Sequence, residues 1–362
     1  MTRRITPAVA AAFAAIYLIW GSTYLAIKFA IATLPPLTMM GIRSLAAGGL
    51  LYMWGRWRGG EPPRLADWKA AGLIGALLFL GAHGGLSWAE GRVPSGVAAL
   101  FIATIPLWMT LIQASIEGAA VFTKRTVTGL AAGTLGIVVL VGRGPGTLWQ
   151  GEPVDPLGAA VLILAALSWS VGTAMAQRRP RRTSLAVTSG SYLLAGGALL
   201  LAAGSLAGEL RDLRVDAISP GSLAALGYLI GFGSVIAFGA YAWLIRRRSL
   251  AAVSTYAFVN PVVAVFLGWS LGGESLNPRV LVAAALVVAA VVAILSGRAA
   301  HREAGPSIPR TAETARAGRS YDAGRRLPGE ASIHRASPRN GRQRDVWTPR
   351  APLRIDDQPE RR

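Results

Sequence analysis

SWAEGRVPSGVAALFIATIPLWMT (residues 87–110) and AWLIRRRSLAAVSTYAFVNPVVAV (residues 242–265) decide the fold, because they belong to two apolar blocks that align at one offset of 155 residues. At this offset Trp88 falls on Trp243. A hydrophobic block that occurs twice in one chain is typical of membrane transporters built from two structural repeats.

The composition favours a membrane protein. Hydrophobic residues make up 52% of the chain and charged residues 15%, whereas about 25% of a soluble domain is charged. Each of ten apolar stretches, roughly 17 to 25 residues long, is sufficient to cross a hydrocarbon core about 30 Å thick. We place the ten stretches at residues 8–31, 36–54, 70–90, 94–115, 126–142, 156–176, 184–204, 220–245, 249–271 and 279–296.

Loop charges predict the topology. With the N-terminus inside, the inner loops hold fifteen Lys or Arg residues and the outer loops hold five. This bias follows the positive-inside rule and puts both termini in the cytoplasm. Five crossings per repeat is an odd number, so the second repeat enters from the opposite side. The predicted fold is an all-α integral membrane protein with ten transmembrane helices in two inverted five-helix repeats. The N-terminal apolar run continues into further spans, so we interpret it as an uncleaved first span rather than a signal peptide.

The chain divides into four parts. Residues 1–142 form a first repeat, 143–155 an outer linker, 156–297 a second repeat and 298–362 a cytoplasmic tail. The tail carries 15 Arg against 8 acidic residues and few large aliphatic residues, so we expect it to be disordered. Its positive charge suits anionic membrane lipids rather than nucleic acid. A homodimer is left open.

Motifs for enzymatic chemistry are missing from the sequence. It has no Gly-rich P-loop and no His-Glu-x-x-His zinc motif. It has no cysteine, which excludes disulfides and thiolate metal sites. We therefore predict a protein that is not an enzyme and binds no cofactor or metal.

Four ionisable residues within or near the predicted spans are candidates for a substrate cavity. Arg43 lies about 10 Å deep in the second span, at 1.5 Å per residue, where a charge is costly and normally faces a bundle interior or a wet cavity. Lys28 lies nearer the outer interface, and either cation could instead snorkel to the headgroups. His83 and Glu90 share a helical face. His83 could simply be packed, and Glu90 could pair with Lys28 or Arg92.

Aromatic and amide side chains form the rest of the predicted cavity. Trp20 and Tyr24 share a face of the first span, Trp88 precedes Glu90, and the second half adds Tyr256 and Asn260. Aromatic rings with a few polar groups are the usual lining of a small-molecule site, although each ring alone could serve packing.

Two prolines occupy equivalent places in the duplicated blocks, Pro106 and Pro261. A proline within a helix removes a backbone hydrogen bond, and such breaks mark binding sites or hinges in transporters. Duplication alone would also copy a structural kink.

Short motifs from residue 8 to residue 297 resemble those of EamA-type members of the drug/metabolite transporter superfamily. The motifs are IWGSTYLAIK (19–28), PP (35–36), GIR (41–43), WAE (88–90), VPSG (93–96), IPLW (105–108), WSVGT (169–173), VNPV (259–262) and GE (273–274). The resemblance implies ten spans, two inverted repeats and alternating access at a central cavity. His83 departs from it, because an amide such as Asn is expected there.

The sequence thus predicts a multi-pass protein of the bacterial inner membrane. We expect a secondary transporter that exports small metabolites or drugs, with Arg43 and Lys28 favouring an anionic group on the substrate. Coupling would use protons at His83, Glu90 or another group, or transport would be facilitative. The alternative is a membrane sensor or scaffold with a basic tail and no flux.

Overall fold

The protein is described here by a computed structural model, which covers residues 6–117, 122–142, 154–180, 182–244, 247–248, 253 and 255–303. These residues are helical or connect helices, and no strand occurs among them. Most of the predicted linker and the tail beyond residue 303 lie outside them. Seven helical stretches in the described part are long and apolar enough to cross a membrane, whereas α14 and the apolar part of α15 are shorter. The count of ten crossings stays a prediction.

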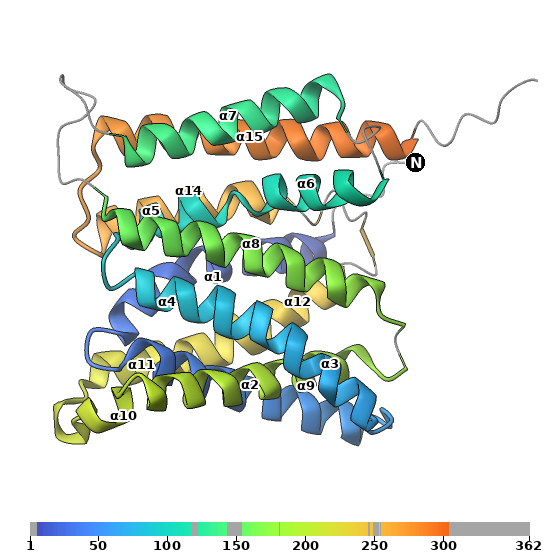
Figure 1. Cartoon of the computed structure of the whole chain (residues 1–362), viewed down its shortest axis with the longest axis vertical. Coiled ribbons are helices and arrows are strands. Elements are labelled where there is room, and N and C mark those ends of the chain that lie inside the picture. Colours follow the sequence, from blue (N-terminus) through green and yellow to red (C-terminus); the bar gives the residue numbers. More distant parts are fainter. Residues whose placement is uncertain are drawn as a thin grey trace, which may run out of the picture. The chain divides into compact units, whose positions relative to one another are not determined.

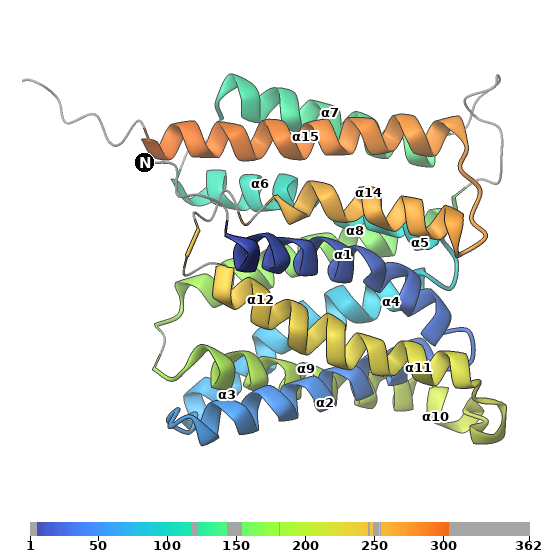
Figure 2. The same cartoon turned by 180° about the vertical axis from the view of Figure 1, so that it is seen from behind.

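The elements follow one another as antiparallel rods (Figures 1 and 2). In chain order they are α1 (Pro7–Ala30), α2 (Pro36–Trp57), α3 (Leu65–Gly75), the π-helical η1 (Ala76–Gly84), α4 (Gly85–Ala89), α5 (Ser95–Ile102), α6 (Ile105–Glu117), α7 (Lys124–Val141), α8 (Pro156–Arg178), α9 (Leu185–Leu206), α10 (Glu209–Asp212), the 3₁₀ turn η4 (Val215–Ala217), α11 (Pro220–Tyr228), the π-helical η5 (Leu229–Ile236), α12 (Ala237–Leu244), α14 (Tyr256–Ser270) and α15 (Pro278–Glu303).

Local sequence explains where several rods begin. Ser184 accepts a hydrogen bond from the Val187 amide at the start of α9. Asp155 caps α8 just before a proline at the first helical position. These are the residue types that satisfy the free amides of a first turn.

We call the end of the bundle where α10 lies the α10 end, and the opposite end, where α3 begins, the α3 end. They are on the left and right of Figure 1.

Glycines allow close contact between α2 and α9. A Cβ added to Gly48 would lie 2.8 Å from Leu193 Cβ, and one added to Gly190 would lie 2.7 Å from the Tyr52 backbone nitrogen. Such close backbone approach is characteristic of helices that pack in membranes. The same pattern joins α7 to α15, where a Cβ on Gly129 would lie 2.7 Å from an Ile294 side-chain carbon. Both figures show these two helix pairs at opposite faces of the bundle.

Two long rods contain π-helical segments. The rod from Leu65 to Ala89 contains η1, and the rod from Pro220 to Leu244 contains η5. π-helical turns are uncommon and are frequent at functional sites. Periodicity did not predict either segment. They place His83 on η1 and Ser234 on η5.

The two prolines differ in their surroundings. The helix stops at Ala103–Thr104, and α6 begins at Ile105, so Pro106 directly follows a break. By contrast, α14 continues through Pro261 without interruption. The helical pattern is thus interrupted just before Pro106 and continues through Pro261, and a break or hinge role for either proline stays a prediction.

The outside of the bundle is apolar. Leu18, Met53, Leu164 and Phe266 each expose more than half of their surface. Large exposed apolar side chains distributed over several helices suit contact with lipid tails.

Candidate functional site

Arg43 is buried on α2, with 8% of its surface exposed. Its Nε donates to Ser234 Oγ at 3.1 Å, and Nη1 lies 3.7 Å from Met40 Sδ. Ser234 in turn donates to the Leu229 carbonyl at 3.0 Å, within η5. In the described part of the chain, no carboxylate oxygen lies within 4.0 Å of the guanidinium. Arg43 is thus a buried cation held by neutral partners, and it does not snorkel to the surface.

Glu90 is a second buried ionisable group. It follows α4, exposes 6% of its surface, and neither carboxyl oxygen has a hydrogen-bond partner among the described residues. Glu274, Lys28 and Arg43 are within electrostatic range of this carboxyl group. A buried carboxyl group without hydrogen bonds is costly in its charged form. Arg43 and Glu90 are thus within electrostatic range of each other without forming an ion pair.

The expected pairing of Glu90 with Lys28 or Arg92 is not what the structure shows. Lys28 Nζ lies 3.0 Å from Glu274 Oε1 and donates to the Gly272 carbonyl at 2.9 Å. Arg92 stacks over the Trp88 ring, with its guanidinium carbon 3.7 Å from the ring centroid, and approaches Asp155 at 3.9 Å. Both cations thus have other partners near the α10 end, because the end of α14 and the start of α8 supply carboxylates that folding brings beside them.

An aromatic cluster joins α1 to the second half of the chain. The Trp20 ring centroid lies 5.0 Å from that of Tyr256, edge to face, and 5.5 Å from that of Tyr241. Trp20 Nε1 donates to the Gly233 carbonyl at 3.1 Å. The Asn260 amide is assigned with its nitrogen toward two backbone carbonyls. In this orientation the nitrogen donates to the Tyr256 carbonyl and to the Tyr17 carbonyl.

Gly233 connects this aromatic cluster to Arg43. A Cβ added to Gly233 would lie 3.5 Å from Arg43 Nη2, and the carbonyl of the same residue receives the Trp20 indole. Tyr24 lies one turn after Trp20 and is within electrostatic range of Glu90 and Tyr256. The structure therefore brings together six of the predicted residues: Arg43, Glu90, Trp20, Tyr24, Tyr256 and Asn260.

His83 and Trp88 make their ring contacts with other residues, although His83 is within electrostatic range of Arg43. The His83 ring stacks on Trp169, with centroids 5.3 Å apart and planes 17° apart, and meets Phe79 edge to face. Trp88 is engaged by Arg92. Aromatic packing explains both positions, and their role in a cavity stays a prediction.

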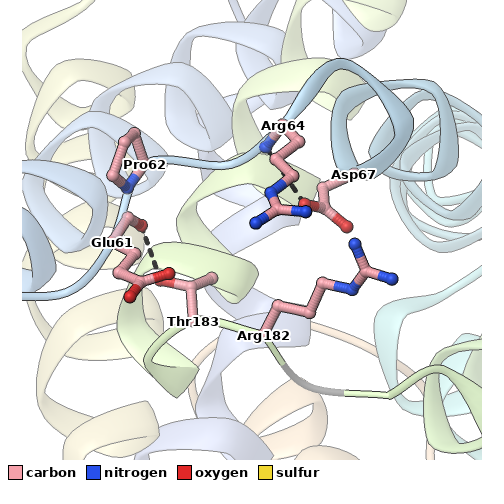
Figure 3. Close-up of a pocket in the computed structure, with 6 residues that line it drawn as sticks. All are labelled: Glu61, Pro62, Arg64, Asp67, Arg182 and Thr183. Atoms are coloured by element: carbon pink, nitrogen blue, oxygen red, sulfur yellow. Dashed lines mark hydrogen bonds between the residues drawn. The ribbon is translucent and has the colours of Figure 1, made fainter.

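A surface pocket lies at the α3 end of the bundle, and Figure 3 shows the residues that line it. Its lining comes from the α2–α3 connection, the first turn of α3 and the α8–α9 connection: Glu61, Pro62, Arg64, Asp67, Arg182 and Thr183. Thr183 Oγ1 donates to the Glu61 carbonyl at 2.7 Å, and the Arg64 amide donates to Asp67 at 3.0 Å. Mixed, solvent-exposed charges joined by local hydrogen bonds are typical of a loop contact rather than a substrate site.

The comparisons with known proteins identify the family. A model of the EamA-like transporter family matches residues 7–142 and 156–296. The chain belongs to the EamA-like transporter family. The uncharacterized inner membrane transporter YedA of Escherichia coli (strain K12) is 38% identical over 298 residues, covering 82% of this chain and 93% of that protein. Protein PecM of Dickeya dadantii is 28% identical over 287 residues, covering 77% of this chain and 91% of that protein.

The resemblance inferred from the short motifs is thereby confirmed. A solved crystal structure, 21% identical, matches with a TM-score of 0.52 over 79% of this chain and 95% of the other, which shows a shared fold. The EamA-like chain is an integral inner membrane protein from a family of transporters.

Proposed function

We propose that this EamA-like protein is a secondary transporter that exports small metabolites or drugs by alternating access and catalyses no chemical reaction. The observation that carries the proposal is the pair of buried ionisable side chains at Arg43 and Glu90. Neither has an ion-pair partner within the described residues. Ionisable groups inside a membrane bundle mark substrate and ion pathways, because an occupant can supply the missing compensation.

Three observations support one composite binding site. Arg43 offers guanidinium donors, Trp20, Tyr241 and Tyr256 offer ring faces and edges, and Gly233 brings the two groups together. An anionic group would be held by Arg43 through planar hydrogen bonding. An apolar or aromatic body would pack on the rings. The preferred substrate is therefore a small amphipathic molecule with an anionic group.

The proposed architecture is ten crossings in two inverted repeats, with both termini in the cytoplasm. Support comes from the loop-charge bias, from the two separate segments matched by the family model, and from the π-helical segments in the third and eighth rods. In this topology the α10 end faces outward.

Proteoliposomes loaded with a panel of amino acids, nucleosides and organic anions test the proposal. Vesicles with wild-type protein should release at least one compound faster than loaded vesicles without protein. Arg43→Ala should abolish this release although the variant still inserts into the membrane. Arg43→Lys should restore part of it, because Lys keeps the charge but lacks the planar fork. Arg92→Ala is the matched control, since it removes an arginine near the α10 end outside the composite site. If no compound on the panel moves, the sensor or scaffold alternative is favoured.

A further inference from the structure

Two helices of the first half lack a cap of their own at the α10 end. α2 and α5 both begin directly after a proline, Pro35 and Pro94, and neither has a local side-chain cap. Their first amides would be unsatisfied. In both cases the partner is a carboxylate from the second half of the chain. Glu209 accepts from the Leu37 amide at 3.1 Å and from the Thr38 amide at 2.7 Å.

Glu274 caps α5 in the same way, with more partners. Its carboxylate accepts from the Ser95 amide and Ser95 Oγ, both at 2.7 Å, and from the Gly96 amide at 3.0 Å. Lys28 at the end of α1 adds a fourth contact at 3.0 Å. Three separate segments of the chain therefore meet at one carboxylate whose side chain is only 8% exposed.

Glycines leave the space that the Glu274 carboxylate occupies. A Cβ added to Gly268 would overlap Glu274 Oε2, and one added to Gly96 would lie 3.3 Å from the same atom. Glu274 follows Gly273, whose φ of +66° turns the chain after α14 in a conformation that favours glycine. The end of α14 is thus shaped to present this carboxylate to the first turn of α5.

The charge of Glu274 strengthens the contact. Burial would raise the pKa of this carboxyl group, but the hydrogen bonds from Gly96, Ser95 and Lys28 outweigh burial and hold its pKa below its usual value. An ionised carboxylate at a helix N-terminus is favoured by the free amides and the helix dipole.

The two caps that the second half of the chain supplies, Glu209 and Glu274, differ in what they connect. Glu209 belongs to α10, directly after α9, and α2 and α9 pack with backbone contact at Gly48 and Gly190. Its cap thus joins two helices that already form one unit. Glu274 instead joins three segments, because it caps α5 from the end of α14 and also binds Lys28 at the end of α1. α14 lies against both helices: a Cβ on Gly21 would lie 2.6 Å from Val263 Cβ, and one on Gly96 would lie 3.0 Å from Val265 Cα.

We propose that Glu274 is a gating residue of the transport cycle, which closes the outer side by capping α5 and releases Ser95 and Gly96 when the outer ends of α1 and α14 move away from α5. The inference rests on the proposed alternating access and adds a residue to it. Lys28 moves with α14 and remains the partner of the carboxylate in both states. Glu274 acts through helix position rather than by contact with substrate.

Distance measurement by electron–electron double resonance tests the gate without any substrate. The native chain has no cysteine, so spin labels at Gly91→Cys, before α5, and Leu271→Cys, after α14, report the gap in the full-length protein. Wild type should show mainly one short distance. Glu274→Gln should raise the ratio of a longer-distance population about tenfold, equivalent to about 1.4 kcal/mol.

A second variant separates gating from misfolding. Gly268→Ala keeps the Glu274 carboxylate but places a methyl group in the space that the carboxylate occupies, so it should raise the same long-distance population. Glu209→Gln is the matched control, because it weakens the cap of α2 at the same end of the bundle and should leave the distance distribution unchanged.

Two results would overturn the gate. One is an unchanged distribution in a folded Glu274→Gln or Gly268→Ala protein. The other is an equal rise in Glu209→Gln, which would indicate general loosening. Loss of flux in the proteoliposome panel would refute transport but would not alter these distances, so the two failures are distinguishable.

Discussion

Replacing Gly48 by Ala should separate helix packing from helix propensity, because the next residue is a matched control. A Cβ on Gly48 would lie 2.8 Å from Leu193 Cβ and 2.9 Å from the Leu194 nitrogen, whereas one on Gly49 would meet nothing within 4 Å. Both glycines lie within α2, far from its ends. Gly48→Ala therefore forces α2 and α9 apart, and Gly49→Ala does not.

The magnitude follows from two opposing effects. Each substitution gains about 0.8–1.0 kcal/mol of helix propensity, which cancels when the two variants are compared. Only Gly48→Ala overpacks an interface, which costs about 1–3 kcal/mol. The atoms that the added Cβ would meet include backbone atoms, so repacking of a side chain alone cannot relieve the contact. We expect Gly48→Ala to be less stable than Gly49→Ala by about 1–3 kcal/mol.

Thermal unfolding of purified protein in one detergent, followed by tryptophan fluorescence, measures this gap. Each kcal/mol corresponds to about 2–4 °C for a domain of roughly this size. Gly49→Ala should unfold at or slightly above the wild-type temperature, and Gly48→Ala clearly below Gly49→Ala. Equal unfolding temperatures for the two variants would refute close α2–α9 contact at Gly48.

Three further predictions concern the α10 end, the aromatic cluster and the topology. The stability advantage of wild type over Glu274→Gln should be complete above the ordinary carboxyl pKa of about 4.3 and should shrink as pH falls through the lowered pKa of Glu274; an advantage that grows on acidification of unfolding assays would contradict the ionised cap. Trp20→Phe removes the indole donor to Gly233 and should slow flux by several-fold while Trp57→Phe, at an exposed ring, leaves it unchanged. Single cysteines at Glu61 and Arg214 should react with a membrane-impermeant maleimide from the inside and the outside, respectively, and labelling of both from one side would exclude the proposed topology.

Residues with a local signal were the predictable part of this protein. Long apolar runs gave the rods, and cap residues such as Asp155 and Ser184 set local starts. Arg43 stood out because a charge far inside an apolar run is costly wherever the helix packs. The structure adds that its partner is Ser234, on a π-helical segment that periodicity does not reveal.

Glu274 was missed as a functional residue because its role depends on tertiary contacts. The sequence places it just after an apolar run, beside two glycines, where a carboxylate usually faces solvent. Its partners Ser95 and Lys28 lie 179 and 246 residues away along the chain. The missing local cap on α5 was a usable signal, since a helix that starts after proline needs an acceptor from elsewhere. The same long-range contact explains why Lys28 does not pair with Glu90.

The central claim is that Arg43 and Glu90 act on a bound substrate rather than neutralise each other. A flux measurement on the double variant tests this claim most directly. Initial rates in proteoliposomes would be compared for wild type, Arg43→Ala, Glu90→Ala and the double variant, at equal amounts of inserted protein. If both charges serve transport, the double variant should be as inactive as Arg43→Ala. If they merely neutralise each other, removing both should restore flux toward wild type, and that recovery would contradict the proposed site.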